Sequence, residues 1–246
     1  TAVARAAPDG YTVGLASIAS NAANRWLYRQ MPFDPERDFA AVGMIAAVPN
    51  IAVIPPAVPA RDLQGFIAWA RAQGRPINYG SVGAGSSQHL AGAQFGMITG
   101  LPMQHLPYTN SGQMNTDLIE GRTDLLFQSI SAVTQMAQAG RMRPIAVSGT
   151  ERVPAFPDLP TMREQGVEIT STGWFGLCTP AGVPEPILAR LESELLAVME
   201  EPELRARIIA GGSLPRRMGR AEFAAFMREE SERWRVVIQA VGATAE

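Results

Sequence analysis

Glycine and serine dominate residues 79–90, which read YGSVGAGSSQHL. A glycine-rich loop that leads into the first turn of a helix is typical of an anion site, because the helix end presents free N–H groups and a partial positive charge. Two more polar stretches, residues 17–21 (SIASN) and 108–113 (YTNSGQ), also precede predicted helices. Three helix ends that converge would hold an anion without any lysine or arginine.

The same serines have a purely structural interpretation as well. Serine is one of the residues that helix N-caps prefer, because its hydroxyl accepts a bond from an N–H group of the first turn. Ser20, Ser87 and Ser111 would then cap their own helices and bind nothing else. The residue pattern alone leaves both interpretations open.

The basic residues limit the chemistry, because all 21 of them are arginine and the chain contains no lysine. This excludes a P-loop, Schiff-base chemistry and attachment of pyridoxal phosphate, which all need a lysine. The single cysteine, Cys178, has no histidine near it in the sequence, so we expect a buried structural thiol. Two histidines without cysteine or acidic partners at ligand spacing predict no metal site, and we expect no cofactor.

The composition is that of an ordinary globular protein. The 246 residues are 46% hydrophobic and 18% charged, which suits one large domain or two lobes. A net charge of -2 without a basic cluster argues against nucleic-acid binding. No run approaches the roughly 18–20 apolar residues of a membrane span. The chain begins at Thr1 without a methionine, so a missing signal peptide says nothing about localisation.

Short apolar runs alternate with amphipathic segments along the middle of the chain. Segment 61–74, for example, predicts a helix with Leu63, Phe66, Ile67 and Ala70 on one face. Such alternation favours a parallel sheet with right-handed crossovers, whose ligands bind at the carboxyl ends of the strands. We predict strands at 11–17, 76–81, 103–108, 123–129 and 143–149, helices at 21–30, 61–74, 87–98, 112–121 and 130–140, and an extended run at 171–182.

Other segments lead to further expectations. The apolar run 42–56 is broken at Pro49-Asn50 and is too interrupted for one helix. The region from residue 185 to the C-terminus has an all-helical pattern. Asp124 is expected at the surface just before its strand, and Arg143 is expected to be exposed to solvent.

Six segments of the chain are distinctive together. They read APDGYTVGLAS, MPFDPERDFAAVGMIAAVPNIAVIPP, INYGSVGAGSSQHLAG, LPYTNSGQMNTDLIEGRTDLLF, RPIAVSGTERVPAFPDLPTMREQG and GWFGLCTPAGVPEPIL. In this order they resemble the signature segments of the Bug family, the TctC-like solute-binding proteins of tripartite tricarboxylate transporters. The resemblance runs from about Ala2 to about Gly242. No single segment is decisive, but six in the right order are strongly specific.

The resemblance implies an α/β protein with the type II periplasmic-binding-protein fold. Such a fold has two Rossmann-like lobes, a ligand cleft between them and a two-strand hinge. Lobe 1 would comprise residues 1–49 and 176–246, and lobe 2 residues 50–175. The chain would cross between them near Pro49-Asn50 and near Gly173–Phe175. In the family the lobes close around the ligand.

The resemblance also implies a small carboxylate ligand, which would be a dicarboxylate, a tricarboxylate, an acidic amino acid or an aromatic acid. The protein would be a periplasmic monomer that serves the membrane components of a tripartite tricarboxylate transporter, or else a sensor kinase. By position, the ligand-binding loops of the family correspond to Ser17, Ser20, Gly83, Gly85, Ser86, Ser87, Asn110, Ser111 and Gly112.

Two side chains and one segment refine this expectation. Many relatives carry aspartate at the position of Gln128, where a carboxylate suits a ligand's ammonium group. The neutral glutamine favours plain carboxylates or amides. Trp174 either lines the cleft or packs at the hinge. Family members usually begin with a further segment, which holds the first strand and a ligand loop, and its end would run directly into Thr1.

Two other classes of function share this architecture. An enzyme, such as a hydrolase or transferase, would use His89 with Ser86 or Ser87, but no G-x-S-x-G motif and no orienting carboxylate accompany them. The effector domain of a cytosolic transcription regulator would need a helix-turn-helix upstream. The order of the family segments favours the binding protein, and His89 then has a structural role.

Overall fold

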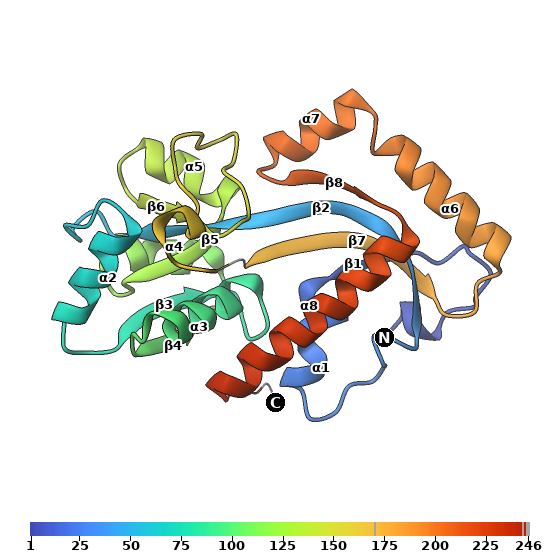
Figure 1. The fold of residues 1–246 in the computed structure, drawn as a ribbon, viewed down its shortest axis with the longest axis horizontal. Helices are drawn as coiled ribbons and strands as arrows, with labels where there is room; N and C mark the ends of the chain where they lie inside the picture. Colours follow the sequence, from blue (N-terminus) through green and yellow to red (C-terminus); the bar gives the residue numbers. More distant parts are fainter. Residues whose placement is uncertain (170, 243, 245–246) are drawn as a thin grey trace. The chain divides into compact units, whose positions relative to one another are not determined.

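The computed structural model describes residues 1–169, 171–242 and 244, and the chain forms two compact units. Unit 1 comprises Thr1–Ala47 and Gly173–Glu246, and unit 2 comprises Val48–Thr172. The first boundary falls inside strand β2 (Phe39–Ile54), and the second falls after the first residue of strand β7 (Thr172–Pro180). Both strands can be followed in Figure 1. The lobe boundaries given above stay a prediction.

Unit 2 is built on a mixed sheet. Strand β3 (Ile77–Ser81) pairs in parallel with β4 (Met103–Pro107) and with β5 (Leu125–Ser129). The last residues of β2 pair antiparallel with β5 and with β6 (Arg143–Val147). The predicted parallel sheet is therefore confirmed for β3, β4 and β5, which helical crossovers connect, and is wrong for β2.

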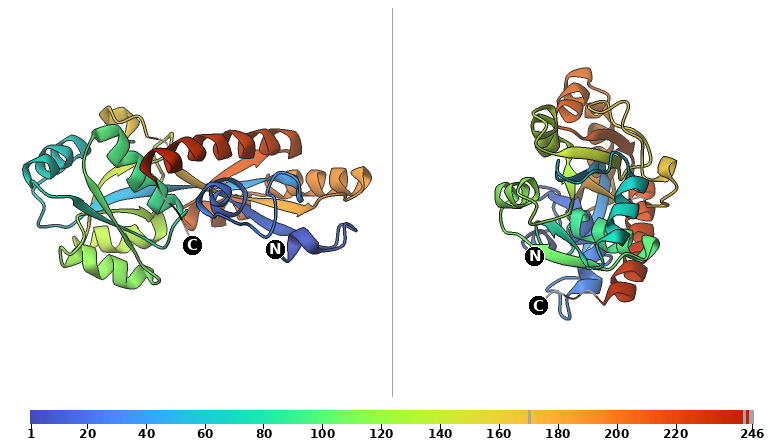
Figure 2. Two further views of the ribbon diagram at one scale, coloured as in Figure 1. Left: turned by 90° about the horizontal axis from the view of Figure 1, so that it is seen from below. Right: turned by 90° about the vertical axis from the view of Figure 1, so that its left-hand side faces the viewer.

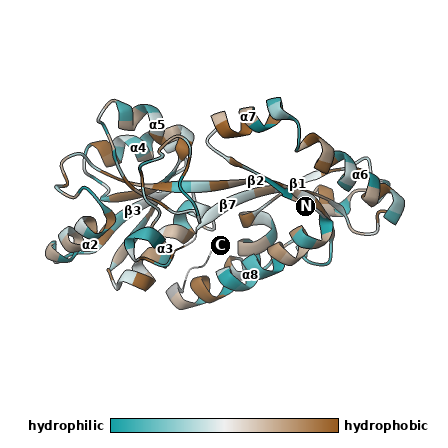
Figure 3. Ribbon diagram, turned by 45° about the horizontal axis from the view of Figure 1, so that its top comes forward, coloured by the Kyte–Doolittle hydropathy of each residue, from teal (hydrophilic) through white to brown (hydrophobic). Residues whose placement is uncertain are grey.

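Helices cover both faces of this sheet. Helices α2 (Leu63–Ala72) and α3 (Ser87–Thr99) contribute Phe66 and Phe95 to one apolar cluster. Helices α4 (Ser111–Ile119) and α5 (Ile130–Gln138) contribute Met114 and Val133 to another. Successive residues of a strand point to opposite faces, so β2 and β5 contribute side chains to both clusters. Figure 2 gives two further views, and Figure 3 colours the same elements by hydropathy.

The sequence predicted most of these elements. Helix α2 buries the four predicted residues of its apolar face. Residues 42–54 of the apolar run 42–56, however, belong to one continuous strand, β2, which has no break at Pro49. A proline is tolerated in a strand where no donor is needed. Pro49 lies between the residues paired with β8, which end at Ala47, and those paired with β5, which begin at Asn50.

Unit 1 combines strands with the C-terminal helices. Strand β1 (Gly14–Ser17) pairs antiparallel with β7, and a π-helical turn, Ala19–Ala23, leads into the short helix α1 (Asn24–Leu27). Helices α6 (Glu185–Val198), α7 (Pro202–Ala210) and α8 (Arg220–Val241) follow β7. Short 3-10 turns lie at Val3–Arg5 and Arg163–Gln165, the latter in unit 2.

The all-helical expectation for the C-terminal region is wrong at one place. Strand β8 (Leu214–Met218) lies between α7 and α8 and pairs antiparallel with β2. Its sequence, LPRRM, has no strand-like alternation of apolar residues. The pairing with a distant strand, and not local preference, therefore makes this segment extended.

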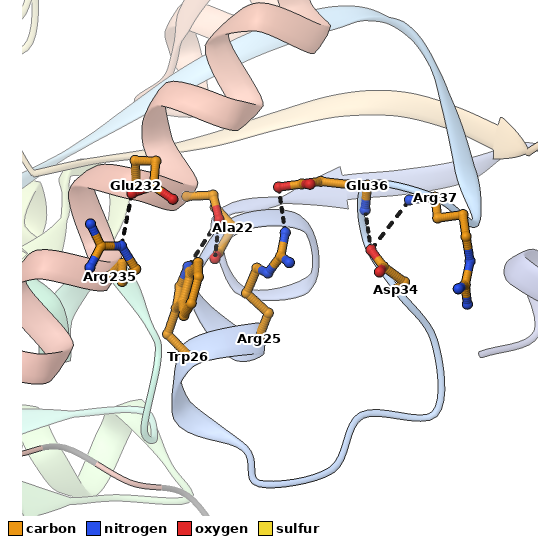
Figure 4. A network of polar contacts seen from close by, with 9 residues as sticks. Ala22, Arg25, Trp26, Asp34, Glu36, Arg37, Glu232 and Arg235 are labelled. Atoms are coloured by element: carbon orange, nitrogen blue, oxygen red, sulfur yellow. Dashed lines mark hydrogen bonds and ion pairs between the residues drawn. The ribbon is translucent and has the colours of Figure 1, made fainter.

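A polar relay ties α1 to α8 inside unit 1. The indole N–H of Trp26 donates to Ser231 Oγ at 3.0 Å, and that hydroxyl donates to the carbonyl of Ala22 at 3.3 Å (Figure 4). The loop beyond α1 is held by Asp34, whose Oδ1 accepts from the backbone N–H of Glu36 at 2.9 Å (Figure 4). The bonds of Trp26 and Ser231 hold the helix that follows the polar stretch 17–21.

Two charged residues are less exposed than expected. Asp124 is only 5% exposed, because its carboxylate accepts two bonds from Arg75, at 2.7 and 2.8 Å, and one from Asn78 N at 2.8 Å. Arg143 is half-buried and donates to the carbonyls of Val58, Ala60 and Pro56. Both expectations of a surface position are wrong, because each charge finds partners that compensate for its burial.

We predict that Asp124→Ala lowers the free energy of unfolding by about 2 kcal/mol, since hydrogen bonds to a charged group are lost and Asn78 N is left unpaired. Urea unfolding measures the change. The control is Asp158→Ala, an exposed aspartate of the same unit, which should stay within about 0.5 kcal/mol of the unchanged chain. Equal effects of the two substitutions would contradict the structural role of Asp124.

Candidate functional site

Three helices of unit 2 begin at the same edge of its sheet. The parallel strands β3, β4 and β5 are in register near their ends, with Ser81 opposite Pro107 and Gly80 opposite Leu126. Each strand is followed along the chain by a helix: α3, α4 and α5 in turn. The N-termini of the three helices therefore share the edge at which parallel strands end.

Two of these N-termini are capped one residue earlier than predicted. Ser86 caps α3 and accepts from His89 N at 3.2 Å. Asn110 caps α4 and accepts from the backbone N–H groups of Gly112, at 2.6 Å, and Gln113, at 3.3 Å. Ser87 and Ser111 are the first helical residues, so the proposed capping role is wrong for both.

The serine hydroxyls at this edge are available to a ligand. Within the described part of the chain, no residue forms a hydrogen bond with the hydroxyl of Ser87, Ser111 or Ser129. Ser129 is the N-cap residue of α5, yet no side chain caps that helix. The sequence pattern alone did not indicate Ser129 as a site residue. The boundary between β5 and α5, with no loop between them, would have pointed to it.

The glycine loop between β3 and α3 has an unusual backbone. Gly83 has φ 127° and Gly85 has φ 77°, values that favour glycine over any residue with a side chain. The hydroxyl of Ser86 donates to Gly83 O at 2.8 Å, and Gly85 N donates to the imidazole Nδ1 of His89 at 3.2 Å. Both predicted glycines are thus held by side chains of α3 or its cap.

A chain of amide side chains lies beside the loop. Val82 N donates to Gln88 Oε1 at 3.0 Å, and Gln88 Nε2 donates to Gln128 Oε1 at 2.9 Å. Gln128 Nε2 then donates to Asn115 Oδ1 at 2.9 Å. Gln128 is 2% exposed and its oxygen also accepts from Ser129 N. Its amide therefore connects the glycine loop, α4 and α5.

A histidine pair lies under the same loop. The rings of His89 and His105 have centroids 4.2 Å apart, and the ring of Tyr79 packs on both. Burial lowers the pKa of His89, and burial together with His89 lowers the pKa of His105 to about 4. Both side chains are therefore neutral at pH 7. Among the described residues, no group of three His, Cys, Asp or Glu side chains is placed to hold a metal.

Unit 1 holds the remaining predicted loop. The hydroxyls of Ser17 and Ser20 are 3.0 Å apart, and Ser20 Oγ donates to Asn21 Oδ1 at 2.6 Å. Asn21 Oδ1 also accepts from Ser17 N, so the amide oxygen organises the loop. Its Nδ2 group is buried and has no partner in the described part of the chain. The sequence analysis did not select Asn21, although it lies in the quoted stretch SIASN.

Trp174 belongs to the core of unit 1. It is 1% exposed and packs edge-on against Phe223 and Phe226 of α8. Its indole N–H donates to Glu230 Oε2 at 3.1 Å, and Trp234 donates to the same oxygen at 3.2 Å. Burial raises the pKa of Glu230. This environment favours packing, the second of the two roles considered for Trp174. Cys178 is buried too, and burial raises the pKa of its thiol to about 11.

Fold and comparisons together define the class of protein. The mixed α/β fold matches that of periplasmic binding proteins, with strands β2 and β7 at the boundaries of two compact units. The chain belongs to the family described as the tripartite tricarboxylate transporter family receptor, TctC, which matches residues 1–243. Among the described residues, no helix is long and apolar enough to span a membrane. The predicted family and fold are confirmed.

Three solved structures illustrate the likeness. Rpa4515 of R. palustris, solved with adipate, is 31% identical with a TM-score of 0.87, over 99% of this chain and 82% of that one. MatC (Rpa3494) of Rhodopseudomonas palustris, with bound malate, is 26% identical with a TM-score of 0.81, over 96% and 82%. The periplasmic binding protein BugD is 25% identical with a TM-score of 0.83, over 99% and 82%.

We predict that Gln128→Leu lowers the free energy of unfolding by about 1–3 kcal/mol, because Gln88, Ser129 and Asn115 each lose a buried hydrogen-bond partner. The measurement is urea unfolding followed by circular dichroism. Gln138→Leu serves as the control, since Gln138 is an exposed glutamine at the end of α5. If both variants unfold alike, the amide chain adds no stability.

Stability should also depend on pH through His105. Its folded-state pKa, about 4, lies below the ordinary value of 6.5, so the unfolded chain binds more protons between these values. The free energy of unfolding is therefore expected to fall as the pH is lowered from 6.5 to 4. His105→Gln, which keeps a donor for Ser81, should give a flatter profile over that range. If the free energy of unfolding depended on pH in the same way in both chains, titration of His105 would not contribute to stability.

Proposed function

We propose that the protein is an extracytoplasmic solute-binding protein that captures a small carboxylate and delivers it to a tripartite tricarboxylate transporter. One observation carries this proposal: three helix N-termini meet at one edge of the unit 2 sheet with free serine hydroxyls and, at α5, uncapped N–H groups. Helix N-termini attract anions through these donors and through the helix dipole. Carboxylate oxygens are suitable acceptors.

The proposed ligand contacts are given for each unit by itself. In unit 2 they are Gly83, Gly85, Ser86, Ser87, Asn110, Ser111, Gly112 and Ser129, and in unit 1 they are Ser17, Ser20 and Asn21. The buried Nδ2 group of Asn21, which lacks a partner among the described residues, would gain an acceptor. Gln128 is proposed to act through the amide chain rather than by direct contact. These donors are neutral, so the site would select a carboxylate by geometry.

Two solved relatives support a dicarboxylate. Rpa4515 was solved with adipate and MatC with malate. Neither fact assigns the ligand here, because the identities are 31% and 26%. The proposed ligand class remains a small di- or tricarboxylate, an acidic amino acid or an aromatic acid, and the neutral Gln128 favours one without an ammonium group. The proposed partners are the membrane components of the transporter or a sensor kinase, and the proposed compartment is the periplasm.

An enzymatic function has less support. Ser86 Oγ bonds to Gly83 O and to the backbone N–H of His89, not to the imidazole ring. Ser81 does contact a histidine, His105, at 2.7 Å, but it is completely buried. No carboxylate orients either imidazole among the described residues. A nucleophile needs both access to substrate and an oriented base.

The proposal predicts stabilisation by ligand. We expect adipate or malate at 1,000 times its Kd to add about 4 kcal/mol to the free energy of unfolding, which corresponds to a Tm rise of roughly 8–16 °C. Thermal unfolding with these acids, citrate, aspartate and nicotinate measures it. A cooperative transition that no acid shifts would argue against the proposed ligand class.

Helix caps provide a matched pair of variants. Asn110→Ala removes the cap of α4 at the proposed site, and Asp62→Ala removes the cap of α2, where Asp62 Oδ1 accepts from Gly65 N at 2.7 Å. Each should lower stability by about 0.5–2 kcal/mol. Only Asn110→Ala should also weaken binding of the acid, by about tenfold, in isothermal titration calorimetry. Equal affinities for the two variants would place the ligand elsewhere.

A further inference from the structure

We propose that His89 and His105 are positioning residues that hold the glycine loop in its binding conformation, and that His89 does so only while its imidazole is neutral. The inference rests on the proposed function of the loop, and it adds that ligand binding by the loop depends on pH. Neither histidine is proposed to contact the ligand. The two rings act on the two glycines whose backbone conformation shapes the loop, Gly83 and Gly85.

His89 fixes Gly85 through an acceptor that exists only in the neutral ring. Gly85 is buried, and its backbone N–H donates to His89 Nδ1 at 3.2 Å. A backbone amide is always a donor, so Nδ1 must be unprotonated and the ring proton must be on Nε2. Protonation of His89 would place two N–H groups face to face. The loop would then have to move or Gly85 would lose its bond.

His105 fixes Gly83 through Ser81. The hydroxyl of Ser81 donates to Gly83 O at 3.1 Å and accepts from Gly83 N at 3.2 Å. Because the only hydroxyl proton is used in this way, the contact of 2.7 Å with His105 Nε2 makes that nitrogen the donor. The ring therefore anchors the serine, and the serine holds both polar backbone groups of the glycine.

The surroundings of the pair disfavour charge. The titratable groups that face His89 are Tyr79 from β3 and His105 from β4, and β5, which also packs on α3, has none. No carboxylate accompanies the rings within the described residues to stabilise an imidazolium. Two cationic rings with centroids 4.2 Å apart would also repel each other. The loop should therefore keep its conformation at neutral pH and open in acid.

The ring of Tyr79 closes the cluster. It is nearly parallel to the ring of His89, at 4°, and its hydroxyl donates to His89 O at 3.4 Å. It lies on α3 at Gly92, where an added Cβ would come within 2.1 Å of Tyr79 Cε2. Gly92 therefore lets the aromatic ring of Tyr79 pack closely against α3, next to the two histidines.

The first test compares the pH profiles of two chains. Adipate and malate are titrated by calorimetry between pH 7.5 and pH 4.5 into the unchanged chain and into His89→Asn, with the pH values chosen to span the range below about 6.5. Asparagine Oδ1 replaces Nδ1 as an acceptor that does not titrate. We expect the Kd of the unchanged chain to rise about tenfold per pH unit below the pKa of His89. The profile of His89→Asn should reflect only titration of the acid itself. Superimposable profiles would overturn the proposal.

The second test needs no ligand. Nitrogen-15 NMR of the imidazoles should show the Nε2–H form of both histidines at pH 7, and hydrogen exchange should show Gly85 N–H protected. His89→Leu should lose that protection, and His89→Asn should retain it. An Nδ1–H form of His89, or equal protection in both variants, would overturn the proposal. If these results hold but neither acid binds, the proposed ligand class fails and the role of the histidines stands.

Discussion

The first N–H groups of an α-helix have no partner inside the helix, and this constraint shapes unit 2. Strands β3, β4 and β5 run in parallel, so the helices that follow them all begin at one edge. Helix α2 follows the antiparallel strand β2 and begins at the other edge, where Asp62 and Gln165 accept from its first turn. At the edge where α3, α4 and α5 begin, the helix α5 has no side-chain cap, and the hydroxyls of Ser87, Ser111 and Ser129 remain for a ligand.

The donors that remain are kept in place by buried polar groups. The chain from Val82 through Gln88 and Gln128 to Asn115 is continuous, and each buried amide in it has a partner. A buried polar network of this kind stabilises one arrangement when it is complete and is costly when it is broken. The histidine pair holds the two loop glycines, Gly83 and Gly85, in a similar way. The loop is consequently ordered by the residues behind it, which leaves its outer side free for recognition.

Sequence patterns predicted what depends on local periodicity. The helix at 61–74 was found with its buried face, and strands at 76–81 and 123–129 were found to within two residues, because apolar spacing determines both. Strand β8 was missed because it forms by pairing with β2, which is remote in sequence. The burial of Asp124 depends on Arg75, which lies 49 residues away in the sequence, so local sequence patterns could not predict it either.

The site was predicted less completely than the fold. The glycine loop and the stretch around Asn110 do precede helices as predicted, and their role in binding stays a proposal. The caps were predicted one residue late, because Ser86 and Ser87 are alike in sequence. Gln128 was chosen for its chemical type, and only its neighbours in space reveal that its amide is already used. The partnerless Nδ2 of Asn21 could not be recognised without knowing where its oxygen points.

Glu230 gives the protein a built-in optical reporter. Its Oε2 accepts from the indoles of Trp174 and Trp234, which are two of the four tryptophans in the chain. One indole is on β7 and the other on α8, so a single carboxylate oxygen couples the emission of both rings to the contact between these elements. The part of the intrinsic fluorescence that comes from these two rings therefore reports on one point of unit 1, the start of the strand by which the chain returns from unit 2.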